Sequence, residues 1–285
     1  MDKIHIFRQY PVTFQNRWCS VSKIKAIILA GGLGTRLSEE TGLRPKPMVE
    51  IGGRPILWHI MQIYSKFGIQ DFIVCAGYKG YMIKEYFANF AMHNSDVMVD
   101  MARQEVTFTR SQLPPWRVYV ADTGESTMTG GRLGRIRHLV ADDPYFLMTY
   151  GDGLSDVDIG GSIDFHRSHG KLATMTVVRP SARFGSTVIE DGLVREFKEK
   201  PQTEQGLING GFFVLSPRVL DLVENDQTIW EHEPLQKLAE ARQLAAWQHN
   251  GFWQPMDTLR EKHILDEMWV SGKAPWKNSN PSAAS

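Results

Sequence analysis

The sequence predicts an α/β protein with a mostly parallel sheet, helices on both faces of that sheet, and a strand-rich insertion. First, strand-like and helix-like segments alternate from residue 24 to residue 169, which is the order of βαβ units. Second, short continuous apolar runs such as Ile24–Ala30 are typical of parallel strands that are buried on both faces. Third, the 285 residues have an ordinary globular composition, 42% hydrophobic and 22% charged, which supplies a core without disulfides.

The predicted elements of the first part of the chain follow one another in alternation. After the strand Ile24–Ala30, Pro55 opens a helix with Ile56, Ile60 and Ile63 on one face, and Gly68 ends it. The next elements, strand first, are Asp71–Ala76, Tyr81–Phe90, Arg117–Ala121, Gly131–Val140, Tyr145–Tyr150 and Asp158–His169. Because parallel strands need a crossover connection, this order predicts a single sheet covered by helices.

After Lys171 the pattern changes to successive strands. The expected strands are Leu172–Val178, Ser186–Ile189, Val194–Glu199 and Gly211–Leu215, with Asp191-Gly192 as a hairpin turn. Helices are expected at Pro217–Val223, Glu233–Arg242 and Thr258–Trp269. We therefore predict one catalytic domain over residues 23–277, with a strand-rich insertion and a helical end.

The two ends of the chain lack these patterns. Residues 1–22 show no period of 2 or 3.6, and Tyr10-Pro11 interrupts any helix. We expect a poorly ordered extension from a start codon assigned too far upstream, with a docking arm or an atypical transit peptide as alternatives. Residues 278–285 are rich in Ser, Asn, Ala and Pro, so we expect a disordered tail.

Charge and cysteine usage exclude several classes of protein. The chain has 32 Lys and Arg against 32 Asp and Glu, a net charge of zero, and no basic block, so nucleic acid is not an expected partner. No uncharged apolar run approaches the ~18 residues of a membrane span, so no membrane partner is expected. Cys19 and Cys75 do not make a disulfide framework, which points to a cytoplasmic, reducing compartment.

The strongest local motif follows the first predicted strand and reads Leu29, Ala30, Gly31, Gly32, Leu33, Gly34, Thr35, Arg36 and Leu37. Glycines let backbone N–H groups approach a phosphate closely, and arginine adds a planar fork of donors. The motif is not a dinucleotide fingerprint, because Leu37 stands where a third glycine is required, and it lacks a Walker A lysine. It predicts a phosphate-binding turn, and a glycine-rich turn without a ligand is the alternative.

A lysine held between two prolines comes next, in Arg44-Pro45-Lys46-Pro47-Met48. The prolines fix an extended backbone, which makes Lys46 an aimed point charge. Together the two motifs resemble the sugar-1-phosphate nucleotidylyltransferases, which join a nucleoside triphosphate to a sugar phosphate and release pyrophosphate. The resemblance implies a Rossmann-like nucleotidyltransferase fold. It assigns the triphosphate contacts to Leu29, Ala30, Gly31, Gly32, Leu33, Gly34, Thr35, Arg36 and Lys46.

Two aspartates are candidate ligands of Mg²⁺. Asp152 stands between Gly151 and Gly153 directly after the strand Tyr145–Tyr150, at the sheet edge where α/β proteins bind ligands, although an ordinary turn is the alternative. Asp257 is the second candidate, and it could equally cap the last helix. Neither has a basic partner nearby in the sequence, so we expect both to converge on one Mg²⁺. Gly151 is expected to contact the nucleotide.

Two later segments resemble the sugar-phosphate motifs of the family. They are Glu199-Lys200-Pro201 and Asn209-Gly210-Gly211. The resemblance implies that Lys200 pairs with the sugar phosphate, while Glu199, Asn209 and Gly210 hold sugar hydroxyls. Without the first two motifs, solvated turns would be the better interpretation of both segments.

The stretch Asp122–Leu133 departs from the base-recognition loop of many relatives, which place a Gln before Pro-x-Gly-x-x-x-Ala. With Gly251–Arg260 and Gly272–Lys277, it resembles family members that use CTP and glucose 1-phosphate. This resemblance runs from about residue 23 to residue 277. It implies that Thr127, Gly131 and Arg132 face CTP. It also implies that the product is CDP-glucose, a precursor of dideoxysugars in bacterial O-antigen lipopolysaccharide.

The expected enzyme is thus a nucleotidyltransferase that relies on positioning and charge. A sugar phosphate is a dianion near neutral pH, so its in-line attack on the α-phosphorus needs no general base. Arg36, Lys46, Lys200 and Mg²⁺ would neutralise charge. The alternatives are the same chemistry with UTP or dTTP, a non-catalytic sugar-nucleotide-binding subunit, and a nicotinamide dehydrogenase, which the broken fingerprint disfavours. We expect a homo-oligomer, although no motif fixes the oligomeric state.

Overall fold

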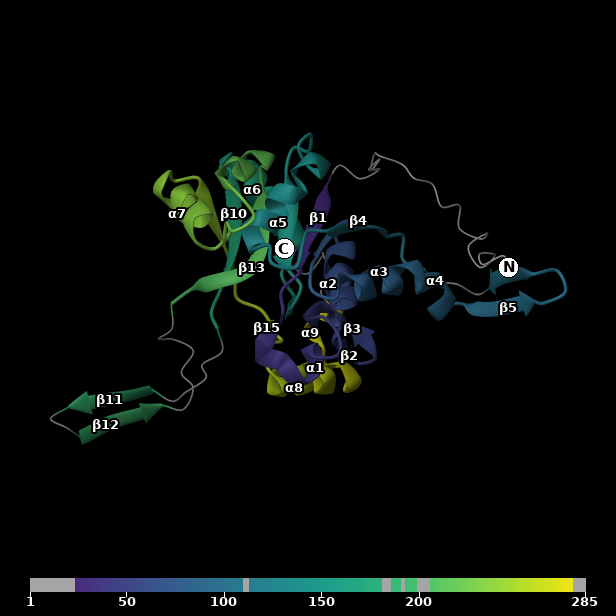
Figure 1. Cartoon of the computed structure of the whole chain (residues 1–285). Coiled ribbons are helices and arrows are strands. Elements are labelled where there is room, and N and C mark those ends of the chain that lie inside the picture. Colours follow the sequence, from purple (N-terminus) through teal and green to yellow (C-terminus); the bar gives the residue numbers. More distant parts are fainter. Residues whose placement is uncertain (1–23, 110–112, 181–185, 191–192, 199–205, 279–285) are drawn as a thin grey trace.

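A seven-stranded sheet forms the centre of the protein (Figure 1). The computed structural model describes residues 24–109, 113–180, 186–190, 193–198 and 206–278. In spatial order the strands are β14 (Leu244–His249), β10 (Ala173–Val178), β13 (Ile208–Leu215), β8 (Phe146–Tyr150), β1 (Lys25–Ala30), β4 (Asp71–Ala76) and β7 (Arg117–Asp122). Strand β13 runs antiparallel to β8 and β10, and every other neighbouring pair is parallel. The predicted α/β class with a mostly parallel sheet is confirmed.

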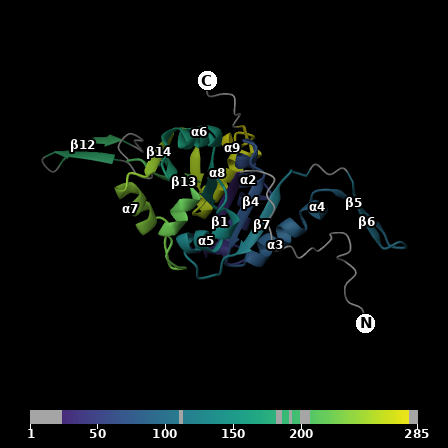
Figure 2. The same cartoon turned by 90° about the horizontal axis from the view of Figure 1, so that it is seen from above.

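Helices and short turns of 3-10 helix connect and cover the strands (Figure 2). The α-helices are α1 (Ser38–Thr41), α2 (Ile56–Ser65), α3 (Gly80–Ala88), α4 (Phe90–His93), α5 (Thr129–Arg135), α6 (Ile159–His169), α7 (Glu233–Glu240), α8 (Leu259–Val270) and α9 (Pro275–Asn278). The 3-10 turns are Thr35–Leu37, Lys46–Met48, Arg137–Leu139 and Pro217–Leu222. Within the described ranges, no helix has the length and apolar character needed to cross a bilayer.

Two hydrophobic cores lie on opposite faces of the sheet, because alternate residues of a strand point to opposite faces. Ala26 and Ile28 of β1 belong to the core that includes α2, α8 and α9. Ile27 and Leu29 belong to the core that includes α5 and the 3-10 turn Pro217–Leu222. Strand β1 is buried along its whole length, so the loop that follows it starts from a rigid support.

The strand-rich region after Lys171 is smaller as a separate unit than the sequence suggested. Strands β10 and β13 are integral parts of the central sheet. Among the described strands of this region, only β11 (Ser186–Glu190) and β12 (Leu193–Lys198) pair solely with each other. The sequence missed β14, which extends the sheet beside β10.

Three more two-stranded ladders complete the described elements. They are β2 (Glu50–Ile51) with β3 (Arg54–Pro55), β5 (Asp96–Asp100) with β6 (Glu105–Thr109), and β9 (Gly153–Ser155) with β15 (Trp253–Pro255). The β5–β6 hairpin, which the sequence did not predict, projects from the body in both views (Figures 1 and 2). The β9–β15 ladder brings residues 253–255 beside the end of β8 and therefore shapes the site.

The order of the strands creates a ligand-binding crevice. From β1 the chain goes to β4 on one side and later returns to β8 on the other, so the strand order reverses at β1. In open α/β sheets, ligands bind outside the carboxyl ends of the strands at such a switch point. Here Leu29 near the end of β1 is in register with Tyr150 at the end of β8, and the Gly151 N–H donates to the Leu29 carbonyl at 2.9 Å.

Candidate active site

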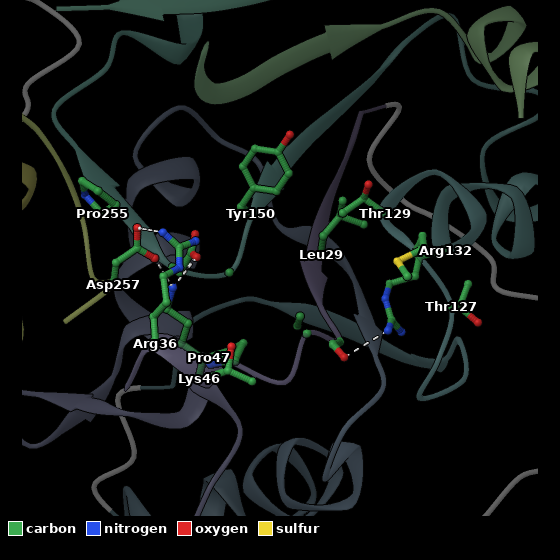
Figure 3. A pocket seen from close by; sticks show the side chains of 18 of the residues that line it. Leu29, Arg36, Lys46, Pro47, Thr127, Thr129, Arg132, Tyr150, Pro255 and Asp257 are labelled. Atoms are coloured by element: carbon green, nitrogen blue, oxygen red, sulfur yellow. Dashed lines mark hydrogen bonds and ion pairs between the residues drawn. The ribbon is translucent and has the colours of Figure 1, made fainter. Parts of the chain in front are cut away.

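A cavity of about 600 Å³ opens at the carboxyl ends of β1 and β8. This volume lies within the ordinary range for small-molecule sites. Figure 3 shows Arg36, Lys46 and Asp257 on one side of the cavity and Thr127, Thr129 and Arg132 on the other. The cavity thus has an end lined by charged side chains and an end formed by the loop that leads into α5.

The glycine loop after β1 needs small residues for two different reasons. Gly34 has a φ of +64°, in the left-handed region that glycine adopts without strain. At Gly31 the obstacle is space, because a Cβ atom there would lie 2.1 Å from the Arg132 guanidinium carbon. Space is also the obstacle at Gly151 after β8, where a Cβ atom would lie 2.9 Å from Pro47 and 3.0 Å from the Leu29 carbonyl oxygen.

Arg132 holds the glycine loop against the loop that leads into α5. Its guanidinium is buried and donates hydrogen bonds to the carbonyl oxygens of Gly31 at 3.0 Å and Gly124 at 2.7 Å, and to the Thr123 hydroxyl at 2.7 Å. It also donates to the carbonyl of Glu125 at 3.2 Å. Most of the hydrogen bonds that Arg132 donates therefore go to backbone carbonyl groups, although its side chain lines the cavity.

The charged end of the cavity consists of one lysine between two aspartates. Lys46 Nζ donates to Asp152 Oδ2 and to Asp257 Oδ1, each at 2.7 Å. Arg36 Nη1 donates to Asp257 Oδ2 at 3.0 Å from a side chain that is 75% exposed. The two aspartates, which have no basic partner nearby in the sequence, thus share Lys46, a basic residue that is distant from both in the sequence.

The charge on Lys46 is stabilised by its surroundings. Burial alone would lower the pKa of Lys46, but the Asp152 carboxylate and then that of Asp257 outweigh burial and raise this pKa above its ordinary value. The side chain is 12% exposed, and the prolines on both sides fix its backbone at the start of a short 3-10 turn. The ammonium is thus a fixed positive charge at the mouth of the crevice.

Asp257 can take part in this cluster because a neighbour caps the helix. The N-cap of α8 is Thr258, whose side chain accepts from the Glu261 N–H, and Glu261 Oε2 accepts in return from the Thr258 N–H at 2.9 Å. The sequence left open that Asp257 itself caps this helix. The structure assigns the cap to Thr258, so the carboxylate of Asp257 faces Lys46 and Arg36.

Aromatic and amide side chains form the wall between the two ends of the cavity. Tyr150 at the end of β8 and Trp253 in β15 both line it, together with Asn209 in β13. The Trp253 indole N–H donates to the Gly210 carbonyl at 2.7 Å, which fixes the ring. A smaller cavity of about 50 Å³ adjoins this wall and reaches Gly210.

Most of the site residues expected from the sequence meet at this cavity. Those that line it are Leu29, Ala30, Gly31, Gly32, Gly34, Thr35, Arg36, Lys46, Thr127, Arg132, Gly151, Asp152, Asn209 and Asp257. Three others are not part of its lining: Leu33 is 52% exposed, Gly131 is packed against the backbone of Asp226, and Gly210 lines the smaller adjoining cavity. The predicted Glu199 and Lys200 lie outside the described residues.

The sequence did not single out several residues that line the cavity: Pro47, Met128, Thr129, Tyr150, Trp253 and Pro255. Tyr150 and Thr129 each lie within two residues of a predicted contact, so their position in the motifs was the available signal. Trp253 and Pro255 enter only because β15 pairs with β9, a contact between distant segments that no local pattern marks.

Comparison with known proteins gives the family. The nucleotidyl transferase family matches residues 25–254. A glucose-1-phosphate cytidylyltransferase of Salmonella typhi is 59% identical over 254 residues, which cover 89% of this chain and 99% of the relative. A probable glucose-1-phosphate cytidylyltransferase of Bacillus subtilis is 42% identical over 255 residues, covering 89% and 99%.

Solved structures share the fold at lower identity. HddC from Yersinia pseudotuberculosis in complex with GMP-PN has a TM-score of 0.62 at 24% identity, covering 86% of this chain and 99% of that one. A UDP-glucose pyrophosphorylase in complex with UDP-glucose also has a TM-score of 0.62, at 14% identity, covering 87% and 98%. From the family match and its full-length relatives, this chain belongs to the nucleotidyl transferase family and is a nucleotidyltransferase.

Proposed function

We propose that this enzyme transfers a cytidylyl group from CTP to α-D-glucose 1-phosphate and releases pyrophosphate. The observation that carries the proposal is the Asp152–Lys46–Asp257 cluster, which lies at the switch point of the sheet beside the glycine loop. A glycine loop that accepts phosphates, with a fixed ammonium and two carboxylates at its end, suits a triphosphate and a divalent cation. The choice of CTP and glucose 1-phosphate is supported by the relatives that carry this name.

The donor nucleotide lies, in this proposal, along the glycine loop. Gly31, Gly32, Gly34 and Thr35 line the phosphate end of the cavity, and Lys46 and Arg36 add positive charge there. Thr127 and the loop into α5 form the opposite end, where the base binds. Arg132 acts mainly on the shape of this end, since it fixes the carbonyls of Gly31 and Gly124.

Asp152 and Asp257 are the residues that would hold Mg²⁺. The fit rests on geometry and chemistry, since both carboxylates point an oxygen at one cationic atom and carboxylate oxygens are preferred ligands of this ion. Among the described residues no group of three His, Cys, Asp or Glu side chains forms a closed metal cage. Mg²⁺ usually keeps phosphate and water ligands beside one or two carboxylates, so two aspartates suffice. When bound, the ion neutralises phosphate charge and makes the α-phosphorus more electrophilic.

The acceptor supplies its own nucleophile. An oxygen of the glucose 1-phosphate dianion attacks the α-phosphorus of CTP, a new P–O bond forms, and the bond to the β-phosphate breaks with pyrophosphate as the leaving group. No general base is needed, so the protein's contribution is alignment and charge neutralisation. Lys46 and Arg36 stabilise the charge that develops on the phosphates. Asn209 and Gly210, which line the smaller cavity, are proposed to hold sugar hydroxyls together with Glu199, and Lys200 is proposed to pair with the sugar phosphate.

The assembly of the enzyme is proposed from its surface. We infer a homo-oligomer in which the β5–β6 hairpin contacts a second copy of the chain. Val97, Met98 and Val99 of β5 are 40%, 59% and 54% exposed, and Met101 in the turn is 83% exposed. Successive residues of a strand point to opposite faces, so exposed apolar side chains lie on both faces of this projecting hairpin, as expected of a contact surface.

A pyrophosphate-release assay with five nucleoside triphosphates, each against glucose 1-phosphate, tests the proposed function. We expect CTP to give a kcat/KM at least tenfold higher than that of UTP, dTTP, ATP or GTP. A clear preference for another triphosphate would overturn the base assignment. Absence of release with all five would overturn the reaction.

A further inference from the structure

Glu231 lies behind the cavity wall and contacts two residues that form it. It stands in the segment between the 3-10 turn Pro217–Leu222 and α7, and its side chain is partly buried. One carboxylate oxygen accepts from the Tyr150 hydroxyl, and the other accepts from the Thr129 hydroxyl at 2.6 Å. Tyr150 and Thr129 both line the cavity, whereas Glu231 is not among the residues that line it.

The Tyr150 contact belongs to the wall that the main cavity shares with the smaller cavity around Asn209 and Gly210, where the acceptor is proposed to bind. The ring lies directly over Gly211, where a Cβ atom would be 2.8 Å from the ring and where φ is +81°. Burial, and then the negative charge of Glu231, raise the pKa of Tyr150, so its hydroxyl remains a donor. Asn209 Nδ2 approaches the same hydroxyl oxygen at 3.5 Å. The orientation of Tyr150 is thus fixed at its ring by Gly211 and at its hydroxyl by Glu231.

The Thr129 contact belongs to the nucleotide end. Thr129 is the first residue of α5, and its hydroxyl oxygen also accepts from the Trp230 N–H at 2.9 Å. The segment containing Glu231 follows the loop closely, because the Met128 N–H donates to the Asp226 carbonyl at 2.8 Å and the Gly131 N–H to the Thr228 carbonyl at 3.1 Å. A movement of the loop that leads into α5 therefore also moves the segment that contains Glu231. Figure 3 shows the Thr129 and Tyr150 hydroxyls directed the same way.

We propose that Glu231 is a positioning residue that couples nucleotide binding to acceptor binding. When the nucleotide binds, it orders Thr129 and the loop that leads into α5, and Thr129 then fixes the Glu231 carboxylate. The carboxylate in turn fixes the side chain of Tyr150, against which the sugar packs. The acceptor then binds to a wall that is already ordered, so its affinity rises. Couplings of this kind between two sites are typically 5- to 150-fold. The inference rests on the proposed function for the identity of the two ligands.

The experiment is calorimetric titration of glucose 1-phosphate into the full chain, with and without saturating α,β-methylene-CTP, which cannot release pyrophosphate. In the wild type, the analogue is expected to lower the Kd of glucose 1-phosphate at least fivefold. Glu231→Ala removes both acceptors and is expected to reduce this factor to twofold or less. Tyr150→Phe keeps the ring and removes the hydroxyl, so it is expected to lose the coupling in the same way, and the double variant is expected to lose no more than either single variant.

A control variant and a second variant of Glu231 accompany this titration. Glu233→Gln changes an exposed carboxylate two residues away that pairs with Lys237, and it should preserve the wild-type factor. Should Glu231→Ala fail to fold, Glu231→Gln, which can accept from only one hydroxyl, is expected to show a reduced factor. A wild-type factor in the Glu231 and Tyr150 variants, or no coupling in the wild type, would overturn the inference. Loss of pyrophosphate release by the wild type with CTP itself would instead overturn the proposed function.

Discussion

One ammonium group between two carboxylates defines the chemistry of this protein at the scale of single residues. Lys46 Nζ is 2.7 Å from an oxygen of Asp152 and 2.7 Å from an oxygen of Asp257. Two carboxylates that close to one point would repel each other without a cation between them. The sequence predicted Mg²⁺ beside these carboxylates, and the structure shows that Lys46 itself supplies a positive charge at this point.

Replacing either aspartate by asparagine keeps the shape of the site and removes one charged ligand. We expect Asp152→Asn and Asp257→Asn each to lower kcat by about 10² or more, by comparison with other losses of transition-state stabilisation. Excess Mg²⁺ should recover part of the loss, because the weakened site binds the ion less tightly. Turnover measured across a Mg²⁺ titration checks this.

The matched control is Asp164→Asn, which alters a surface carboxylate of α6 that pairs with Arg167. Its turnover and Mg²⁺ dependence should match the wild type. Near-normal turnover in either site variant would remove that aspartate from the proposed metal site.

His59 makes the stability of the protein depend on pH. Its ring is fully buried, its Nε2–H donates to the Ile51 carbonyl at 2.8 Å, and its Nδ1 accepts from the Trp276 indole N–H at 3.3 Å. Burial lowers the pKa of His59 to about 4. Between this value and about 6.5, the unfolded chain binds more protons than the folded one, so stability is fully present above pH 6.5 and falls with decreasing pH.

From this shift we expect His59 to reduce the free energy of unfolding by about 2 kcal/mol between pH 7 and pH 5. Urea unfolding at the two pH values measures the change. His59→Gln keeps a donor for Ile51 but does not titrate, so its loss between the two pH values should be smaller by about that amount. His166, whose pKa burial also lowers to about 4, contributes equally in both proteins. An identical pH dependence in wild type and variant would contradict the assignment.

At the scale of elements, helix α5 is positioned by a segment that is distant in sequence. A Cβ atom on Gly131 would lie 2.4 Å from the Asp226 carbonyl oxygen, and one on Gly130 would lie 2.8 Å from that of Thr228. The two glycines therefore let residues 226–228 pack directly on the first turn of α5. This explains the glycine at position 131 without a direct contact to nucleotide.

Gly131→Ala should force the two segments apart and displace the nucleotide loop. Overpacking of this kind costs about 1–3 kcal/mol, so we expect the KM for CTP to rise about tenfold with a smaller change in the KM for glucose 1-phosphate. Steady-state kinetics on both substrates measures the difference. Gly206→Ala, at a position with nothing within 4 Å of the added carbon, is the control. Equal KM values for CTP in Gly131→Ala and wild type would show that this packing does not shape the site.

The buried elements are those that the sequence predicted best. Strand β4 has the predicted bounds Asp71–Ala76, because a continuous apolar run between turns has few other interpretations. Strand β14, with the sequence Leu-Ala-Ala-Trp-Gln-His, is poor in β-branched residues and carries no alternation. The β5–β6 hairpin lacks a glycine turn, since Gln104 takes the left-handed conformation with φ of 56°. Both elements depend on tertiary contacts that a local pattern does not record.

At the scale of the whole molecule, the sequence could predict those parts of the site that directly follow the ends of buried strands. The motifs after β1 and β8 had to meet because neighbouring parallel strands end at one edge of the sheet. The ion pairs of Lys46, the backbone role of Arg132 and the support from Glu231 were not predictable, since each joins segments that only the complete fold brings together.

The proposed oligomer depends on the β5–β6 hairpin. Replacing Val97, Met98 and Met101 together by threonine removes apolar area from a solvent-facing hairpin without touching either core. We expect the wild type to be an oligomer by light scattering after size-exclusion chromatography, and the triple variant to be shifted toward smaller species. Thermal unfolding of the triple variant serves as the check on folding. An unchanged mass distribution would place the contact elsewhere.

The most direct test of the central claim follows the oxygen atoms of the acceptor. Glucose 1-phosphate labelled with ¹⁸O on its phosphate is incubated with CTP, Mg²⁺ and the enzyme, and the products are examined by ³¹P NMR. We expect CDP-glucose with ¹⁸O in the bridge to the α-phosphorus, together with unlabelled pyrophosphate. Labelled pyrophosphate, or the absence of CDP-glucose, would contradict it.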